Sequence, residues 1–234
     1  MRAPGSPPPA DALLVFAKAP EAGRVKTRLC PPMEPVDAAA FYAAMLEDVL
    51  DASAAFAKEL GLAAVLCLDS PEGSEALPFP VPEPFAVEAQ RGSGLAARME
   101  SALEAAFARG ARRVLVRGSD SPTLSRAHLE EALQGLRTHD FVFSPDQGGG
   151  YGLVGCSRSR PGLLDLPMST ETVFRDTLDR ARAWGVGVQS LQPCFDLDRW
   201  ADLEALRGAR EGPLGLLCPR TLAFLDAGSW WFRA

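Results

Sequence analysis

Short apolar runs alternate with longer amphipathic segments along most of this chain. Short continuous apolar runs bounded by charged or turn-forming residues predict buried strands, and longer stretches with apolar residues at helical spacing predict helices. The predicted strands are residues 12–17, 63–69, 85–90, 112–120, 140–145, 151–156 and 186–191, the fourth of them ending in a loop. The predicted helices are residues 36–59, 95–110, 125–136, 169–185 and 198–208.

This alternation of strands and helices predicts a three-layer α/β sandwich with a mixed, mostly parallel sheet. The chain has 234 residues and no internal repeat, so we expect one domain over residues 11–234. The proline-rich residues 1–10 are expected to form a disordered leader. In sheets of this kind ligands bind beyond the carboxyl ends of the strands. The loops that follow the strands are therefore the place to look for a site.

Composition narrows the possible partners. Hydrophobic residues make up 47% of the chain, charged residues 23%, and the net charge is −6. An acidic protein is not attracted as a whole to nucleic acid or to an anionic membrane, and no apolar run approaches the ~20 residues that a membrane span needs. The five cysteines form no C-x-x-C pair, which indicates free thiols in a reducing cytoplasm. The oligomeric state stays open.

The loop after the first strand is basic, although the protein is acidic. The stretch "FAKAPEAGRVKTRL" (16–29) contains two lysines and two arginines. Backbone N–H groups in such a loop, together with arginine, favour phosphate, but an ordinary solvated loop remains the alternative. The P-loop and Rossmann glycine patterns are both absent. The candidate nucleotide-phosphate residues are Lys18, Gly23, Lys26, Thr27 and Arg28.

Carboxylates follow two other predicted strands. Asp120 stands in "GSDSPTL" directly after the fourth strand, where it suits Mg²⁺ or caps the turn. Asp196 and Asp198 are two residues apart, so in an extended segment both point the same way. Two such charges favour a cation between them, although Asp198 could instead cap the following helix. Asp120, Asp196 and Asp198 are the candidate metal ligands.

A glycine-rich segment separates two strands at "DQGGGYGLVG" (146–155). Glycine lets the backbone approach a ligand closely, whereas the alternative is a loose hairpin turn.

Five of these motifs occur in an order that resembles a known family. "FAKAPEAGRVKTRL", "GSDSPTL", "GGGYGLVG", "STETV" and "DLDRWADLEAL" are similar to the bacterial DUF2064 family, also called the radical-SAM/selenodomain-associated transferases. The likeness runs from about residue 13 to residue 206. It implies a GT-A-like fold, that of the nucleotide-diphospho-sugar transferase superfamily, and extends more loosely to 2-phospholactate guanylyltransferases.

Read with this resemblance, the basic loop and the carboxylates form a polyphosphate site. Lys26 and Arg28 are expected to hold the donor phosphates and stabilise the leaving group, with Asp120 as the third catalytic residue. The carboxylates would hold Mg²⁺ or Mn²⁺. The expected acceptor-side loop consists of Gly149, Gly150, Tyr151, Ser169 and Thr170.

The sequence leaves three functions open. The first is nucleotidyl transfer from a nucleoside triphosphate to a small phosphorylated acceptor, and the second is glycosyl transfer from a nucleotide-diphospho-sugar to a small acceptor. The third is nucleotide binding without turnover, because Gly148 stands where the family usually has aspartate. Asp146, two residues earlier, is a possible substitute for it.

Overall fold

The computed structural model describes residues 11–168 and 170–228. The predicted leader and Ser169 lie outside these residues. One seven-stranded sheet runs in the order β3-β2-β1-β4-β6-β5-β7, and four of its six pairings are parallel. The strands are β1 (Ala12–Lys18), β2 (Ala63–Asp69), β3 (Ala86–Ala89), β4 (Val114–Gly118), β5 (Phe141–Pro145), β6 (Tyr151–Cys156) and β7 (Val188–Ser190).

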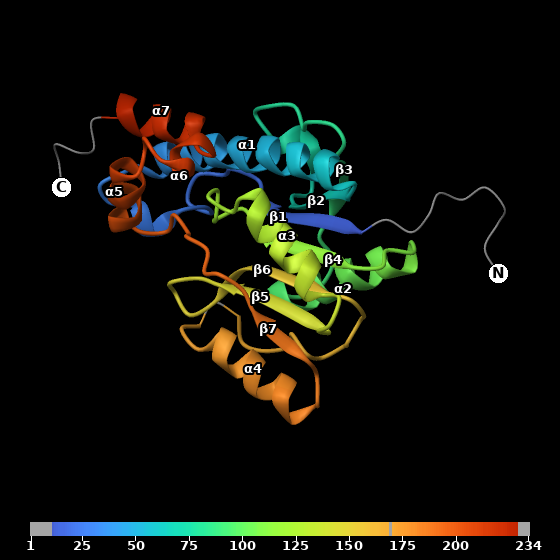
Figure 1. The fold of residues 1–234 in the computed structure, drawn as a ribbon. Helices are drawn as coiled ribbons and strands as arrows, with labels where there is room; N and C mark the ends of the chain where they lie inside the picture. Colours follow the sequence, from blue (N-terminus) through green and yellow to red (C-terminus); the bar gives the residue numbers. More distant parts are fainter. Residues whose placement is uncertain (1–10, 169, 229–234) are drawn as a thin grey trace.

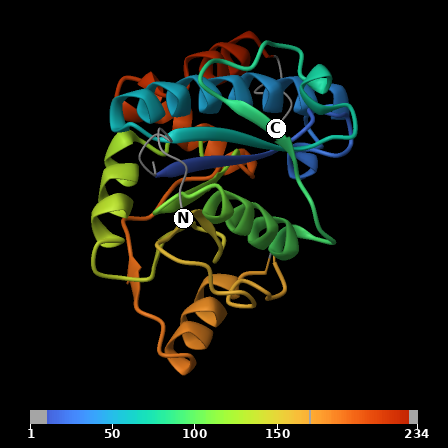
Figure 2. The same ribbon diagram turned by 90° about the vertical axis from the view of Figure 1, so that its right-hand side faces the viewer.

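Helices cover both faces of the sheet and complete the three layers (Figures 1 and 2). The α-helices are α1 (Pro35–Leu60), α2 (Leu95–Ala108), α3 (Arg126–Gly135), α4 (Val173–Ala183), α5 (Trp200–Gly208), α6 (Pro213–Leu216) and α7 (Pro219–Ala227). Two 3-10 turns are η1 (Thr27–Leu29) and η2 (Gly73–Ala76). Helices α1 and α7 lie on one face, and α2 and α4 on the other. The mixed α/β fold predicted from the sequence is confirmed.

Strand β1 shows why the apolar runs are continuous. Val15 and Ala17 pack with α1, whereas Leu14 and Phe16 pack with α2. Alternate residues of a strand point to opposite faces, so in a strand covered on both faces the apolar residues follow one another without alternation. All residues of β1 except Lys18 are buried.

Strand β6 runs antiparallel between β4 and β5. It therefore begins at the edge of the sheet where β1, β4 and β5 end, and the glycine segment 146–150 lies at that edge. After β7 the chain runs back along the same edge. The Leu197 N–H donates to the carbonyl of Asp120 at 2.9 Å, and the Thr123 hydroxyl donates to the carbonyl of Phe195 at 3.1 Å.

The C-terminal helices α6 and α7 were not predicted. Helix α7 docks on α1 through Asp48, which is buried and accepts hydrogen bonds from the Thr221 N–H and hydroxyl, both at 2.8 Å. This contact joins residues far apart in the sequence, and local periodicity gives no sign of it. In the described residues, no helix is long and apolar enough to cross a membrane.

Two helix starts differ from the prediction. Helix α4 begins at Val173, later than the predicted residue 169. At α5, Asp202 rather than Asp198 caps the first turn by accepting hydrogen bonds from the N–H groups of Asp198 (2.9 Å) and Arg199 (2.6 Å). The side chain of Asp198 is thereby left to face other residues.

Candidate active site

A cleft of about 950 Å³ opens at the carboxyl edge of the sheet. Its walls come from the ends of β1 and β4, from α2, from the glycine segment and from the chain that enters α5. The predicted residues that line it are Arg28, Asp120, Gly149, Gly150, Tyr151, Thr170, Asp196 and Asp198. The structure thus gathers most of the predicted site at one place.

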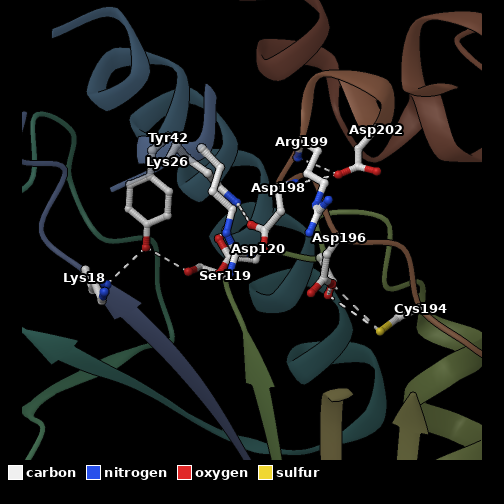
Figure 3. Close-up of polar contacts among 12 residues, drawn as sticks. Lys18, Lys26, Tyr42, Ser119, Asp120, Cys194, Asp196, Asp198, Arg199 and Asp202 are labelled. Carbon is white, nitrogen blue, oxygen red and sulfur yellow. Dashed lines mark hydrogen bonds and ion pairs between the residues drawn. The ribbon is translucent and has the colours of Figure 1, made fainter. Parts of the chain in front are cut away.

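Lys26 lies at the centre of this arrangement (Figure 3). Its ammonium nitrogen contacts Asp120 Oδ1 at 2.5 Å and Asp198 Oδ1 at 3.0 Å, and its side chain is only 3% exposed. The residue has a positive φ of 48° and precedes η1. A non-glycine residue in this conformation is uncommon, and here it turns the ammonium toward the two carboxylates.

The charges of Lys26 and Asp198 stabilise each other. Burial by itself would lower the pKa of Lys26, but the carboxylates of Asp120 and Asp198 outweigh burial and raise it. Burial would likewise raise the pKa of Asp198, but the neighbouring cations, Lys26 first, lower it. Both groups are therefore charged at neutral pH.

Asp196 has a different environment. Its Oδ1 accepts a short hydrogen bond from the Ser121 hydroxyl and lies 4.0 Å from the sulfur of Cys194. Burial and, to a lesser extent, the charges of nearby carboxylates raise the pKa of Asp196 to about 7, against the hydrogen bond from Ser121, which lowers it. Among the described residues, no lysine or arginine forms an ion pair with this carboxylate as Lys26 does with Asp198, so a bound cation would stabilise its charged form.

Tyr42 on α1 ties the first two loops together. Its hydroxyl accepts a hydrogen bond from the Lys18 N–H at 3.1 Å and lies 2.8 Å from the Ser119 hydroxyl (Figure 3). Burial raises the pKa of Tyr42 to about 12, so the group is neutral. The end of β1 is thus held against the turn that carries Asp120.

The basic loop contributes fewer residues to the cleft than predicted. Arg28 lines it, and Arg28 Nη1 contacts Asp198 Oδ2 at 3.0 Å. Lys18, Gly23, Lys26 and Thr27 do not line it, although Lys26 contacts Asp120 and Asp198, which do. Arg24 is paired with Glu21 at 2.8 Å.

Two glycines of the glycine segment have no room for a side chain. A Cβ at Gly149 would overlap the carbonyl of Glu171, and one at Gly150 would lie 2.6 Å from Asp146 Oδ2. Asp146 accepts a hydrogen bond from the Gly150 N–H at 2.8 Å. A Cβ at Gly148 would lie 3.3 Å from Asp146 Oδ1. The carboxylate of Asp146 therefore lies beside the position where a side chain of residue 148 would begin.

The residues at the centre of the cleft suit a hard cation. Asp120 and Asp198 offer carboxylate oxygens, the ligands that Mg²⁺ prefers, and both side chains are partly exposed to the cleft. Asp120 Oδ1 and Asp198 Oδ1 both contact the ammonium nitrogen of Lys26, so the distance between the two oxygens is at most the sum of these two contact distances. In the described residues, the cation between them is the ammonium of Lys26, and no group of three or more acidic, histidine or cysteine residues is arranged as a metal site. The metal role of the aspartates stays a prediction.

Sequence reasoning missed several residues that shape the cleft. They are Ser121 in the turn after β4, Tyr42 on α1, Arg199 at the start of α5, Glu171 before α4 and Leu95 at the start of α2. For α2 the signal was present as Gly92-Ser93-Gly94 immediately before a predicted helix. Nothing in the sequence indicated the role of Tyr42, because an aromatic residue in an amphipathic helix is expected to be part of the hydrophobic core.

The fold and the cleft define a class. This is an α/β protein of the nucleotide-diphospho-sugar transferase fold. A crystal structure of a protein from Desulfovibrio desulfuricans G20, provisionally named a nucleotide-diphospho-sugar transferase, matches with a TM-score of 0.77 and 27% identity over 92% of this chain and 96% of that chain.

Two more distant structures share the fold alone. A nucleotidyl transferase from Methanothermobacter matches with a TM-score of 0.59 and 16% identity over 85% of this chain and 96% of that one. CMP:2-keto-3-deoxy-manno-octonic acid synthetase complexed with CTP matches with a TM-score of 0.53 and 14% identity, over 86% and 98%. A search of curated proteins by sequence finds no match.

The family follows from the sequence. A model of the family described as "Uncharacterized protein conserved in bacteria (DUF2064)" matches residues 52–170, just over half of the chain. The chain belongs to this family, as its motifs indicated. The matched stretch contains the Asp120 turn and the glycine segment. The loop of Lys26 and the pair Asp196 and Asp198 lie outside it, so their roles rest on the geometry of the site.

Proposed function

We propose that this protein is a divalent-metal-dependent transferase that uses a nucleotide donor, and that it transfers the nucleotidyl group of a nucleoside triphosphate to a small acceptor. The observation that carries the proposal is the contact of the buried Lys26 with Asp120 and Asp198, two carboxylates that line a cleft at the carboxyl edge of the sheet. A buried cation between two partly exposed carboxylates provides both signs of charge that a metal–polyphosphate complex needs.

In this proposal Arg28 binds the donor phosphates. Arg28 lines the cleft and can form two parallel hydrogen bonds to phosphate. Lys26 is held by carboxylates on one side and adds positive charge where the leaving group develops negative charge. Asp120, Asp198 and Asp196 would hold Mg²⁺ or Mn²⁺, which when bound neutralises phosphate charge and stabilises the leaving oxygen.

The transfer needs no covalent intermediate. An acceptor oxygen forms a bond to the α-phosphorus, the bond from that phosphorus to the bridging oxygen of pyrophosphate breaks, and the acceptor proton leaves to solvent. In-line displacement of this kind depends on positioning and charge rather than on a nucleophilic side chain. Neither His128 nor His139 lines the cleft.

A second candidate is glycosyl transfer from a nucleotide-diphospho-sugar. The relative with 27% identity and its provisional name favour it. So does the acceptor end of the cleft, where the lining residues around Gly149 include Asp146 and Glu171 but no lysine or arginine among the described residues. A phosphorylated acceptor would have no side-chain cation there, whereas a hydroxyl group can donate to a carboxylate.

The donor and the product distinguish these candidates. Thermal unfolding is measured with common nucleoside triphosphates and nucleotide-diphospho-sugars, each with Mg²⁺, with Mn²⁺ and with EDTA. A donor at a hundredfold excess over its Kd stabilises by about 2.7 kcal/mol. Released pyrophosphate then identifies nucleotidyl transfer, and released nucleoside diphosphate identifies glycosyl transfer.

Acceptors are tested in matched pairs, such as glycerol with glycerol 3-phosphate and glucose with glucose 6-phosphate. A nucleotide that binds but is not consumed with any acceptor would support the third function, nucleotide binding without turnover. If no nucleotide stabilises the protein with either metal, the proposed function is wrong.

We also propose that residues 11–234 form one transferase domain and that it acts in the cytoplasm. One continuous sheet and five free cysteines support this. Limited proteolysis that released a stable fragment lacking part of the sheet would contradict the single domain.

A further inference from the structure

Arg117 on β4 is a buried cation that the proposed chemistry does not use. Its side chain is 0% exposed and is the largest of the fully buried side chains in the described residues. In the part of the chain that the structure describes, it forms no ion pair with a carboxylate, unlike Lys26. Burial lowers the pKa of Arg117 to about 10, so the guanidinium is still charged at neutral pH.

Stability alone does not account for this residue. Taking a charge out of water without an ionic partner costs several kcal/mol, and an apolar side chain of similar length would avoid that cost. The residues paired with Arg117 on the two neighbouring strands, Val15 of β1 and Leu153 of β6, are apolar. A buried charge in such a place requires another explanation.

The hydrogen bonds of Arg117 lead to the turn that carries Asp120. Nη2 donates to the carbonyl of Ser121 at 2.6 Å, and Nε lies 3.5 Å from the carbonyl of Gly118. These are the two ends of the Gly118–Ser121 turn. The third contact runs the other way, from Nη1 to the hydroxyl of Ser53 on α1 at 3.1 Å.

The same turn holds both sides of the site. From its middle, Asp120 contacts Lys26, and from its end the hydroxyl of Ser121 binds Asp196. The planar guanidinium has five donors in a fixed fork, which lets one side chain hold two carbonyl groups of one turn. We propose that Arg117 is a positioning residue, which clamps the Gly118–Ser121 turn from the interior so that Asp120 and Ser121 face the cleft in the geometry that binds a metal–nucleotide complex. This inference rests on the proposed function.

Three variants separate positioning from general stability. Arg117→Met removes all three contacts and the charge, and Arg117→Lys keeps the charge without the planar fork. Ser53→Ala is the matched control, because it removes a contact of the same guanidinium but leaves the turn untouched.

Two measurements are made on each folded variant. Hydrogen–deuterium exchange reports the turn through peptides that cover residues 118–124, and titration calorimetry reports the Kd of the nucleotide that binds the parent most tightly with Mn²⁺. Thermal unfolding is recorded separately. We expect Arg117→Met to exchange faster in the turn and to bind at least tenfold more weakly, and Arg117→Lys to fall between it and the parent. Ser53→Ala should match the parent within twofold in Kd and in exchange.

The inference is overturned if Arg117→Met and Ser53→Ala lose stability but both keep the parent's exchange in the turn and its Kd. If Arg117→Met does not fold, the comparison of Arg117→Lys with Ser53→Ala decides, and a Lys variant identical to the parent in both measurements overturns it. If the parent binds no nucleotide, the proposed function fails, and exchange in the turn alone decides whether Arg117 clamps it.

Discussion

Arg28 and Arg24 offer a matched test of the basic loop. Their side chains are almost equally exposed, at 59% and 57%, and they stand four residues apart. They differ in what surrounds them: Arg28 lines the cleft and contacts Asp198, whereas Arg24 is paired with Glu21 and does not line it. If phosphate binds in the cleft, Arg28→Ala should weaken donor binding and Arg24→Ala should not.

The size of the effect follows from the exposure of Arg28. A charge-assisted hydrogen bond contributes about 1.5–3 kcal/mol when it is well shielded, and exposure to solvent reduces this. We therefore expect Arg28→Ala to cost about 1–2 kcal/mol of donor binding, roughly a fivefold to thirtyfold rise in Kd. Lys26 still contacts Asp198 in this variant, so the carboxylate keeps a cation.

Titration calorimetry with the best-binding nucleotide at fixed Mg²⁺ measures both variants. The difference between them should shrink as the salt concentration rises, because exposed charges are screened. If both variants bind like the parent, the loop is ordinary surface and does not hold phosphate. If Arg24→Ala has the larger effect, the donor lies outside this cleft.

Three further predictions concern the centre of the cleft. Lys26→Met should lower the free energy of unfolding by about 2–3 kcal/mol, because it leaves two facing carboxylates without their cation. In thermal unfolding Mg²⁺ should stabilise this variant more than the parent. Equal stabilisation of the two would contradict a cation shared by both carboxylates. Gly152→Ala should lower the free energy of unfolding in urea by about 1–3 kcal/mol, because its Cβ would overlap the hydroxyl of Ser121. The control Gly208→Ala, whose Cβ meets no atom within 4 Å, should not lower it measurably. Gly148→Asp should lower transferase activity, because it sets a second carboxylate beside Asp146; higher activity would mean that Asp146 does not substitute for the family aspartate.

Much of the architecture could be predicted from local sequence. Apolar runs marked the central strands, because successive positions of a strand covered on both faces are apolar, whereas β3 and β7 contain no buried residue and were predicted from weaker patterns. The alternation with helices predicted the α/β sheet and directed attention to its carboxyl edge, where Asp120 and the glycine segment were expected. The charges of Lys26 and Arg28 were informative because they stand in a loop of an acidic protein.

Tertiary structure decided how these residues meet. The sequence allowed Lys26 to be a phosphate ligand facing solvent, but only the folded chain buries it between Asp120 and Asp198, which are far away along the sequence. It also decided that Asp202 rather than Asp198 caps α5, which leaves Asp198 to face that ammonium. The sequence did not indicate that Arg117 is buried, because a charged residue near the end of a strand is expected to be exposed. Helix and strand formation depends on the local order of apolar and polar residues and can be predicted from the sequence. Contacts between loops depend on strand order and on the path of the chain after β7, which the packing of the whole sheet sets.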